Sequence, residues 1–347
     1  MAETWWSAAP LTLDAGADVA GAVVGLAQSL LCAGTSAPVG LLLCVLGPGL
    51  DGPAARAALD ALLPGAPVVV LQASGVIVGG ELITAGVGML LGQWDGPPAV
   101  VQREAPTEPG LWLSFGEVEV RWPRPWPLAA GVSPGLTAPM GPGGAVWIGL
   151  PPTLVAEPRL ERSAEPVGPL LQITRESHGR IGTLNGENAA TALSALGARL
   201  PEAARERLRT RPLLLSAACP PWAVGGRPPR ARVLGVDGEE GALLVDRPIG
   251  LGAGVYLGAP RARSMSAQLS ARPLRADGLR LGLLLCAPEA GEPDPARIDE
   301  LAALQLVIGA PLLFGLVVEQ QGLSGADGAA IMTDCDVLVA LREPEWD

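Results

Sequence analysis

Long apolar runs separated by short polar breaks dominate the first hundred residues. The pentapeptide Gly-Leu-Leu-Leu-Cys at 40–44 lies in one such run, and a turn of Pro, Gly and Asp follows it. The Ala-rich stretch 53–63 predicts a helix, and Gly-Ala-Pro then leads into the apolar run 68–71. A polar loop containing Gly and a further apolar run at 89–94 close the segment. Apolar runs without polar alternation predict strands that are buried on both faces.

A second segment repeats this order near the C-terminus. Gly-Leu-Leu-Leu-Cys recurs at 282–286, before an acidic Pro and Gly turn and a predicted helix at 295–306. Gly-Ala-Pro, the apolar run 312–318, a polar loop and the run 337–341 complete the copy. A helix between two buried strands is most simply a right-handed β-α-β unit. We therefore expect an α/β or α+β fold of two related halves, produced by internal duplication, in which helices cover the buried strands.

The segment between the two halves shows hairpin patterns instead. Alternating residues flank turns rich in Gly, and one of these turns contains His178, the single histidine of the chain. The expected elements are strands at 170–174 and 180–184, helices at 189–196 and 201–211, and a hairpin turn at 237–238.

Residues 19–50 form a long uncharged stretch that exceeds the length of a membrane span. Gly34, Pro38 and several Ser, Thr and Gln residues interrupt it, which favours a helix, a turn and a buried strand. We therefore expect no membrane insertion. The acidic start of the chain is also unlike a secretory signal.

Composition narrows the chemistry that the chain can perform. All 24 cationic side chains are arginines, and the absence of lysine excludes Schiff-base chemistry, a pyridoxal phosphate anchor and a Walker-type phosphate loop. A net charge of -11 argues against nucleic acid and anionic membranes as partners. The five cysteines have no Cys-x-x-Cys spacing, so they predict buried thiols in a reducing cytoplasm.

Several motifs, taken in order, resemble the FIST domain family. The first runs from Pro166-Val167-Gly168 through Ile173-Thr174-Arg175 to the segment 180–189; the second lies at 232–243 and the third at 309–322. The family usually carries Gly before an acid in the third motif, where this chain has Val318 before Glu319. In the first half, no acid directly follows Ser74-Gly75.

The resemblance covers most of the chain from residue 37 onward. It implies an N-terminal extension at 1–33, a FIST N-terminal-like region at 34–186 and a FIST C-terminal-like region at 187–347. It also implies a cytoplasmic, non-catalytic sensor of signal transduction. Such a protein binds a small ligand, for example an amino acid, without a cofactor, and passes its state to a signalling partner or to another copy of itself.

The loops after the duplicated strands are the expected ligand site. Ligands of α/β folds bind where strands end and backbone donors converge. The alternative is that these residues only form turns and cap strands in solvent. The nominated residues are Gln72, Ser74, Gly75 and Glu81 from the first half and Glu319, Gln320 and Gln321 from the second.

Two other functions stay open. Tryptophans that flank Pro-rich segments, such as Trp5 and Trp6, would build a homo-oligomer or simply pack against proline. A hydrolase would use Ser74 or a cysteine with His178, but the sequence has no Gly-x-Ser-x-Gly elbow and no metal-binding cluster. The glycines at 250–254 have the wrong spacing for a dinucleotide loop and favour the start of a strand. We therefore expect a protein that is not an enzyme and that has neither a catalytic residue nor a metal.

Overall fold

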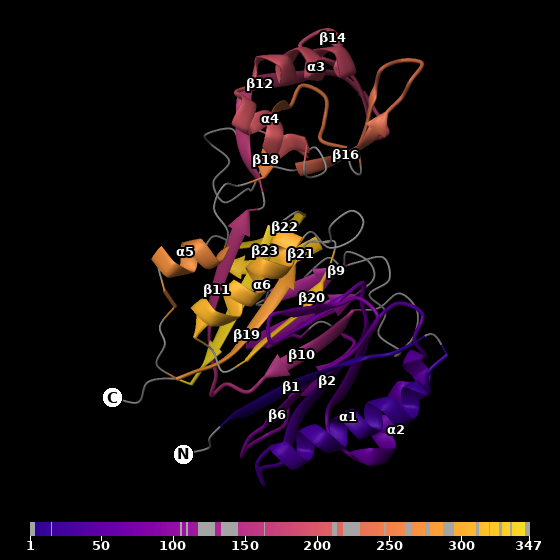
Figure 1. Cartoon of the computed structure of the whole chain (residues 1–347), viewed down its shortest axis with the longest axis vertical. Coiled ribbons are helices and arrows are strands. Elements are labelled where there is room, and N and C mark those ends of the chain that lie inside the picture. The colour runs from indigo at the N-terminus through magenta and orange to yellow at the C-terminus, as the bar shows by residue number, and fades with distance from the viewer. Residues whose placement is uncertain are drawn as a thin grey trace. The chain divides into compact units, whose positions relative to one another are not determined.

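The structure is a computed structural model of the chain (Figure 1). Its described residues fall into two compact units. Unit 2 is formed by the residues of Arg162–Ala262, and unit 1 by the residues before and after that segment. The described residues are 4–14, 16–104, 106–108, 110–116, 129–132, 145–162, 164–209, 214–217, 230–245, 248–260, 265–271, 273–274, 278–286, 295–309, 312–318, 320–325, 328–333 and 335–343.

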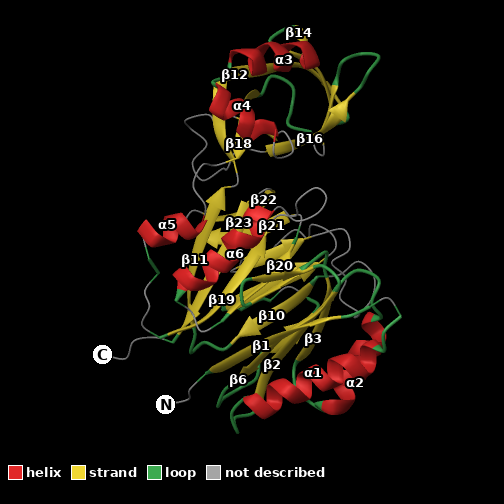
Figure 2. Ribbon diagram, viewed as in Figure 1, coloured by secondary structure: helices red, strands yellow, loops and turns green. Residues whose placement is uncertain are grey.

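Sheet A of unit 1 contains four strands in the order β1-β6-β2-β3. Strands β2 and β3 are parallel, and β6 is antiparallel to both β1 and β2. Two helices, α1 and α2, cover one face of the sheet (Figure 2), where their apolar side chains pack on β2, β3 and β6. The bounds are β1 Trp5–Thr12, α1 Val19–Ala33, β2 Val39–Leu46, α2 Gly52–Leu62, β3 Val68–Gln72 and β6 Gly86–Gln93.

Sheet B of unit 1 has the order β11-β23-β19-β20-β4-β5. Strands β19 and β20 are parallel, and β23 is antiparallel to β19. The helices α5 and α6 pack on its outer face. The bounds are β4 Val76–Val78, β5 Glu81–Ile83, β11 Val155–Arg162, α5 Met265–Ala271, β19 Leu279–Cys286, α6 Pro295–Ile308, β20 Leu313–Val317 and β23 Cys335–Arg342.

The repeated pentapeptide occupies β2 in sheet A and β19 in sheet B. In both strands alternate leucines enter one shared core, while the cysteine and the leucine two positions before it face the covering helices. The strand order β6-β2-β3 corresponds to β23-β19-β20. The α/β fold class is therefore confirmed; descent of the two halves from one duplicated segment stays a prediction.

Sheet C completes unit 1 with the order β22-β21-β9-β8-β10-β7. Side chains of β8 and β10 join those of sheets A and B in one apolar core, which includes Phe115, Ile148 and Phe314. The bounds are β7 Val100–Gln102, β8 Leu111–Gly116, β9 Ala129–Val132, β10 Val146–Leu150, β21 Gln320–Gly325 and β22 Gly328–Thr333.

Unit 2 is a sheet that closes on itself. Its order is β12-β18-β15-β16-β17-β13-β14, and an additional β12–β13 pairing joins the sheet into an antiparallel barrel. Helices α3 and α4 pack against the barrel strands around a second apolar core. The bounds are β12 Ala164–Ser177, β13 Arg180–Leu184, β14 Glu187–Asn188, α3 Ala189–Arg199, α4 Glu202–Arg209, β15 Leu214–Ala217, β16 Arg230–Val236, β17 Leu243–Val245 and β18 Gly254–Pro260.

Several sequence-based expectations can be compared directly with these elements. The uncharged stretch 19–50 forms α1, a turn and β2, as expected, and among the described residues no helix is long and apolar enough to cross a membrane. The expected division at 186/187 falls inside unit 2, in the turn between β13 and β14. The expectation of buried thiols is wrong for Cys32, which is exposed on α1; Cys44 and Cys286 are buried.

Candidate ligand-binding site

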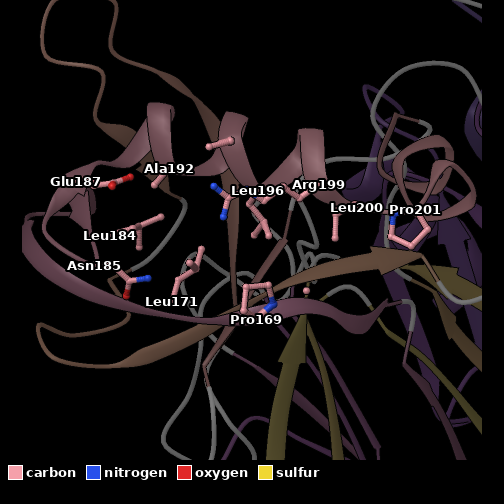
Figure 3. A pocket seen from close by; sticks show the side chains of 12 residues that line it. Pro169, Leu171, Leu184, Asn185, Glu187, Ala192, Leu196, Arg199, Leu200 and Pro201 are labelled. Atoms are coloured by element: carbon pink, nitrogen blue, oxygen red, sulfur yellow. The ribbon is translucent and has the colours of Figure 1, made fainter.

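A cavity of about 490 Å³ lies in unit 2 between α3 and the strands β12 and β13. Figure 3 shows α3 running along one side of the cavity, with the β12 segment around Pro169 on the opposite side. This volume lies in the range of small-molecule sites. The lining residues are Gly168, Pro169, Leu171, Leu184, Asn185, Glu187, Ala192, Ala195, Leu196, Arg199, Leu200 and Pro201.

An irregularity in β12 opens the cavity. The register between β12 and β18 shifts between Val167 and Leu171, so the residues between them leave the regular ladder. Gly168 lies there with a φ of +74°, and a Cβ at this position would stand 3.1 Å from the Cδ1 atom of Leu196. The backbone conformation therefore favours glycine, and a Cβ would also force the Leu196 side chain of α3 to shift slightly.

The floor of the cavity is apolar. Leu171 from β12, Leu184 from β13, and Leu196 and Leu200 from the helix side are all buried there. They belong to the core of unit 2, so the floor is held by packing that does not depend on a ligand.

Three polar side chains line the rim. The Oδ1 atom of Asn185 accepts a hydrogen bond from the backbone N–H of Gln172 at 2.7 Å, which leaves its Nδ2 amide as a donor. Glu187 and Arg199 are exposed lining residues, and neither forms an ion pair among the described residues. The rim therefore presents two donor groups and one carboxylate above an apolar floor.

The N-terminus of α3 is attached to the β16–β17 turn. Asn188 caps the helix by accepting from the Thr191 N–H at 3.2 Å, and its Nδ2 donates to the Glu240 carbonyl at 2.6 Å. The Ala190 N–H donates to the Gly241 carbonyl at 3.0 Å. A displacement of α3 would therefore be transmitted directly to the β16–β17 turn.

The same turn is linked to β13 by charge. Arg180 of β13 forms an ion pair with Asp237, and its distance to the Glu240 carboxylate is 3.8 Å. The backbone hydrogen bond from Glu239 is the main cause that lowers the pKa of the Asp237 carboxyl, and the charge of Arg180 also lowers it. Asp237 is thus stabilised as a carboxylate that faces the arginine.

The residues nominated from the sequence lie in unit 1. Ser74 Oγ donates to the carbonyl of Val317 at 3.2 Å, and the Val317 N–H donates to the Gly75 carbonyl at 2.9 Å. The structure thus places the loop after β3 beside the end of β20, by strand pairing. Gln72 Nε2 instead donates to the Leu50 carbonyl at 2.7 Å.

Of the other nominated residues, only Glu81 has a described side chain, and it does not join Ser74. Glu81 is exposed at the start of β5, across the hairpin from Val78 at the far end of β4. Gln320 and Gln321 belong to β21, but their side chains, like the whole of Glu319, lie outside the described residues. A ligand at these loops stays a prediction.

His178 lies in the tight turn between β12 and β13, as expected. Its φ of +49° and that of Gly179, +75°, are typical of a two-residue hairpin loop. Its Nδ1 lies 2.9 Å from Ser177 Oγ, and the side chain is exposed. The Ser74 hydroxyl donates to the Val317 carbonyl, and a hydrolase that uses Ser74 or a cysteine with His178 stays an untested alternative.

Within the described residues, no group of three or more His, Cys, Asp or Glu side chains is arranged to hold a metal ion. Comparison of the chain with models of protein families found no match, and comparison with curated protein sequences found none either. The resemblance to the FIST family therefore stays a prediction from the order of its motifs.

Two residues of the sequence motifs line this cavity, although the sequence did not predict a cavity here. Gly168 and Asn185 both lie in the segments that resemble the FIST junction. The two signals that were available are the glycine of Pro-x-Gly and the Asn-Gly pair before α3. Arg199 gave no signal, because an arginine in the last turn of a helix is ordinary on electrostatic grounds alone.

Proposed function

We propose that the protein is a non-catalytic, cytoplasmic sensor module that binds a small ligand in the cavity of unit 2. The observation that carries this proposal is the cavity itself, with its apolar floor and three polar side chains on the rim, of which Glu187 and Arg199 have no ion-pair partner among the described residues. The floor supplies affinity through burial of apolar surface, and the rim supplies orientation.

The attachment of α3 to the β16–β17 turn supports a signalling role. A ligand that contacts α3 acts on a helix whose first turn is bonded to Glu240 and Gly241. The outward-facing side chains Leu234, Val236 and Leu244 of this hairpin are exposed and apolar. A change in the position of the hairpin would therefore alter a surface suited to a signalling partner.

A thermal-shift screen of amino acids and central metabolites tests the proposal. Ala195→Phe should fill the cavity mouth and abolish the stabilisation that a ligand confers on the wild type. Ala198→Phe is the matched control, because Ala198 is exposed on the same helix and does not line the cavity. If a ligand stabilises the two variants equally, the cavity is not its binding site. If no ligand stabilises the wild type or either variant, the proposed binding is also contradicted.

A second candidate function is assembly into a homo-oligomer. On α6, the side chains of Ile298 and Leu306 are 47% and 83% exposed, and Trp5 on β1 is 43% exposed. Ile298 and Leu306 stand eight positions apart, so they share one face of the helix. Light scattering at micromolar concentration should give a mass above the 35.3 kDa of one chain, and Leu306→Gln should reduce it. A monomer in both samples rules this function out.

A further inference from the structure

We infer that the cavity of unit 2 selects a small monocarboxylate with an aliphatic chain, whose carboxylate is bound by Arg199. This inference rests on the proposed ligand-binding function and defines its chemical class. It makes Arg199 the residue that determines specificity.

Arg199 is positioned to reach over the cavity. Helical side chains point back toward the N-terminus of their helix, so the guanidinium lies over the turn that carries Leu196. In Figure 3 the guanidinium of Arg199 is drawn on the side of α3 that faces the cavity, toward the N-terminal end of the helix, and both Arg199 and Leu196 line the cavity. Since the guanidinium has no ion-pair partner among the described residues, its charge is available to an anion. A planar carboxylate matches its donor geometry.

Asn185 adds a second donor from the strand side. The backbone N–H of Gln172 binds its Oδ1, and this fixes the orientation of the amide with Nδ2 as the remaining polar atom. The rim therefore offers N–H groups from both α3 and the end of β13. An acceptor group on the ligand satisfies them, whereas an ammonium group does not.

Glu187 limits the ligand to one anionic group at this end of the cavity. A second carboxylate beside Glu187 would be repelled, while an ammonium group there would be attracted. The same carboxylate chemistry is offered by two sources, a short fatty acid and an aliphatic amino acid. The response to the charge of Glu187 separates them.

The leucine floor requires an aliphatic chain. Burial of each additional CH₂ group on this floor should tighten binding by about threefold to fourfold. A cavity of about 490 Å³ has room for a chain of six carbons. Affinity should therefore rise from butanoate to hexanoate.

Isothermal titration of the whole chain with hexanoate, hexanol, hexylamine and norleucine tests the inference. We expect hexanoate to bind the wild type at least tenfold more tightly than hexanol. Arg199→Gln should remove that preference, because it should weaken hexanoate binding far more than hexanol binding. Arg209→Gln is the control: it removes an exposed arginine of α4 that pairs with Glu206 and does not line the cavity, so it should keep the preference.

The Glu187→Gln variant distinguishes the two sources. If norleucine binding weakens about tenfold and hexanoate binding does not, the ligand class is the aliphatic amino acids. If hexanoate binds the wild type more tightly than norleucine and gains affinity in Glu187→Gln, the class is the short fatty acids. Both results support carboxylate recognition by Arg199.

The results that overturn the inference differ from those that overturn the proposed function. Hexanol or hexylamine binding as tightly as hexanoate, with all binding lost in Ala195→Phe, refutes carboxylate selection but leaves a ligand site in this cavity. A carboxylate preference that survives Arg199→Gln also refutes it. If the four probes and the metabolite panel all fail to bind, or if binding is unaffected by Ala195→Phe, the proposed function fails together with the inference.

Discussion

The side chain of Gln93 joins the turn between α1 and β2 to the end of β6. It is 3% exposed, and its Oε1 accepts from the Thr35 N–H at 3.0 Å. Its Nε2 donates to the carbonyls of Thr35 and Ala37, each at 3.0 Å. Gln93→Met keeps the length and the packing of the side chain but removes all three hydrogen bonds, so it isolates their contribution to the stability of unit 1.

The expected loss of stability follows from these bonds. Three hydrogen bonds of about 1 kcal/mol each give an upper value of about 3 kcal/mol. Thr35 is exposed, so water replaces part of the lost bonding, and we expect the free energy of unfolding to fall by about 2 kcal/mol. For a unit of this size, that change lowers Tm by about 4–8 °C.

Urea unfolding followed by tryptophan fluorescence measures this change, because nearly all tryptophans of the chain fall in unit 1. Gln102→Met is the control, since the amide of Gln102 donates to the Glu104 carbonyl at an exposed position. Its effect should stay below about 0.5 kcal/mol. If Gln93→Met is no more destabilising than Gln102→Met, the turn is not held by this amide and the reasoning is wrong.

Three further predictions concern charge and thiol chemistry in unit 1. Burial raises the pKa of the Glu343 carboxyl, but hydrogen bonds from Thr4 and Arg280 outweigh burial and lower it below the ordinary 4.5. The wild type should therefore have a larger free energy of unfolding than Glu343→Gln above pH 4.5. This difference should disappear as the pH falls through the folded-state pKa, and urea unfolding at each pH measures it. Asp336→Ala removes an ion-pair partner that lies 2.6 Å from the largely buried Arg297, so the free energy of unfolding should fall by about 3 kcal/mol. Replacing Asp336 by Leu and Arg297 by Met together should lower it less in the same assay. Cys32 is exposed and should be alkylated in the native protein. Burial raises the pKa of Cys44 to about 12, so peptide mapping should find this thiol alkylated only after unfolding.

The repeated segments could be predicted because their pattern is local. A continuous apolar run, an Ala-rich stretch and a second apolar run gave β2, α2 and β3, and the second copy gave β19, α6 and β20 in the same way. Each of these strands has a helix on one face and the shared core on the other, which explains why its apolar residues do not alternate with polar ones.

The register between the strands could not be predicted, because it depends on distant contacts. Leu42, the third residue of the first pentapeptide, pairs with the first residue of β3, whereas Gly282, the first residue of the second pentapeptide, pairs with the first residue of β20. The two glycines also differ. A Cβ on Gly40 would lie 2.2 Å from the ring of Trp94, while one on Gly282 would be less crowded, with the Leu313 side chain as its nearest neighbour at 3.3 Å.

The polar loop expected after β3 is in fact the β4–β5 hairpin. Its Val-Ile-Val run and Gly79-Gly80 pair are a hairpin signal, but the strand that β4 joins, β20, is more than two hundred residues away in the chain. The turn packs on α6, since a Cβ on Gly80 would stand 2.9 Å from the Leu301 carbonyl.

The hairpins of unit 2 were predicted, but closure of its barrel was not. Closure depends on β12, which pairs with β18 along one part of its length and with β13 along another.

The difference between the nominated loops and the cavity lies in which polar groups remain available. The ends of parallel strands attract ligands because backbone groups there lack partners. At the end of β20, however, Ser74 and Gly75 already exchange hydrogen bonds with Val317, so that pairing uses the groups that a ligand would contact. In unit 2 the irregular part of β12 leaves the ladder, and Arg199 and Glu187 stand beside it without ion-pair partners among the described residues. The proposed selection of a ligand therefore rests on the side chains of α3 and β14 in unit 2, because the pairing of strands does not use their polar groups.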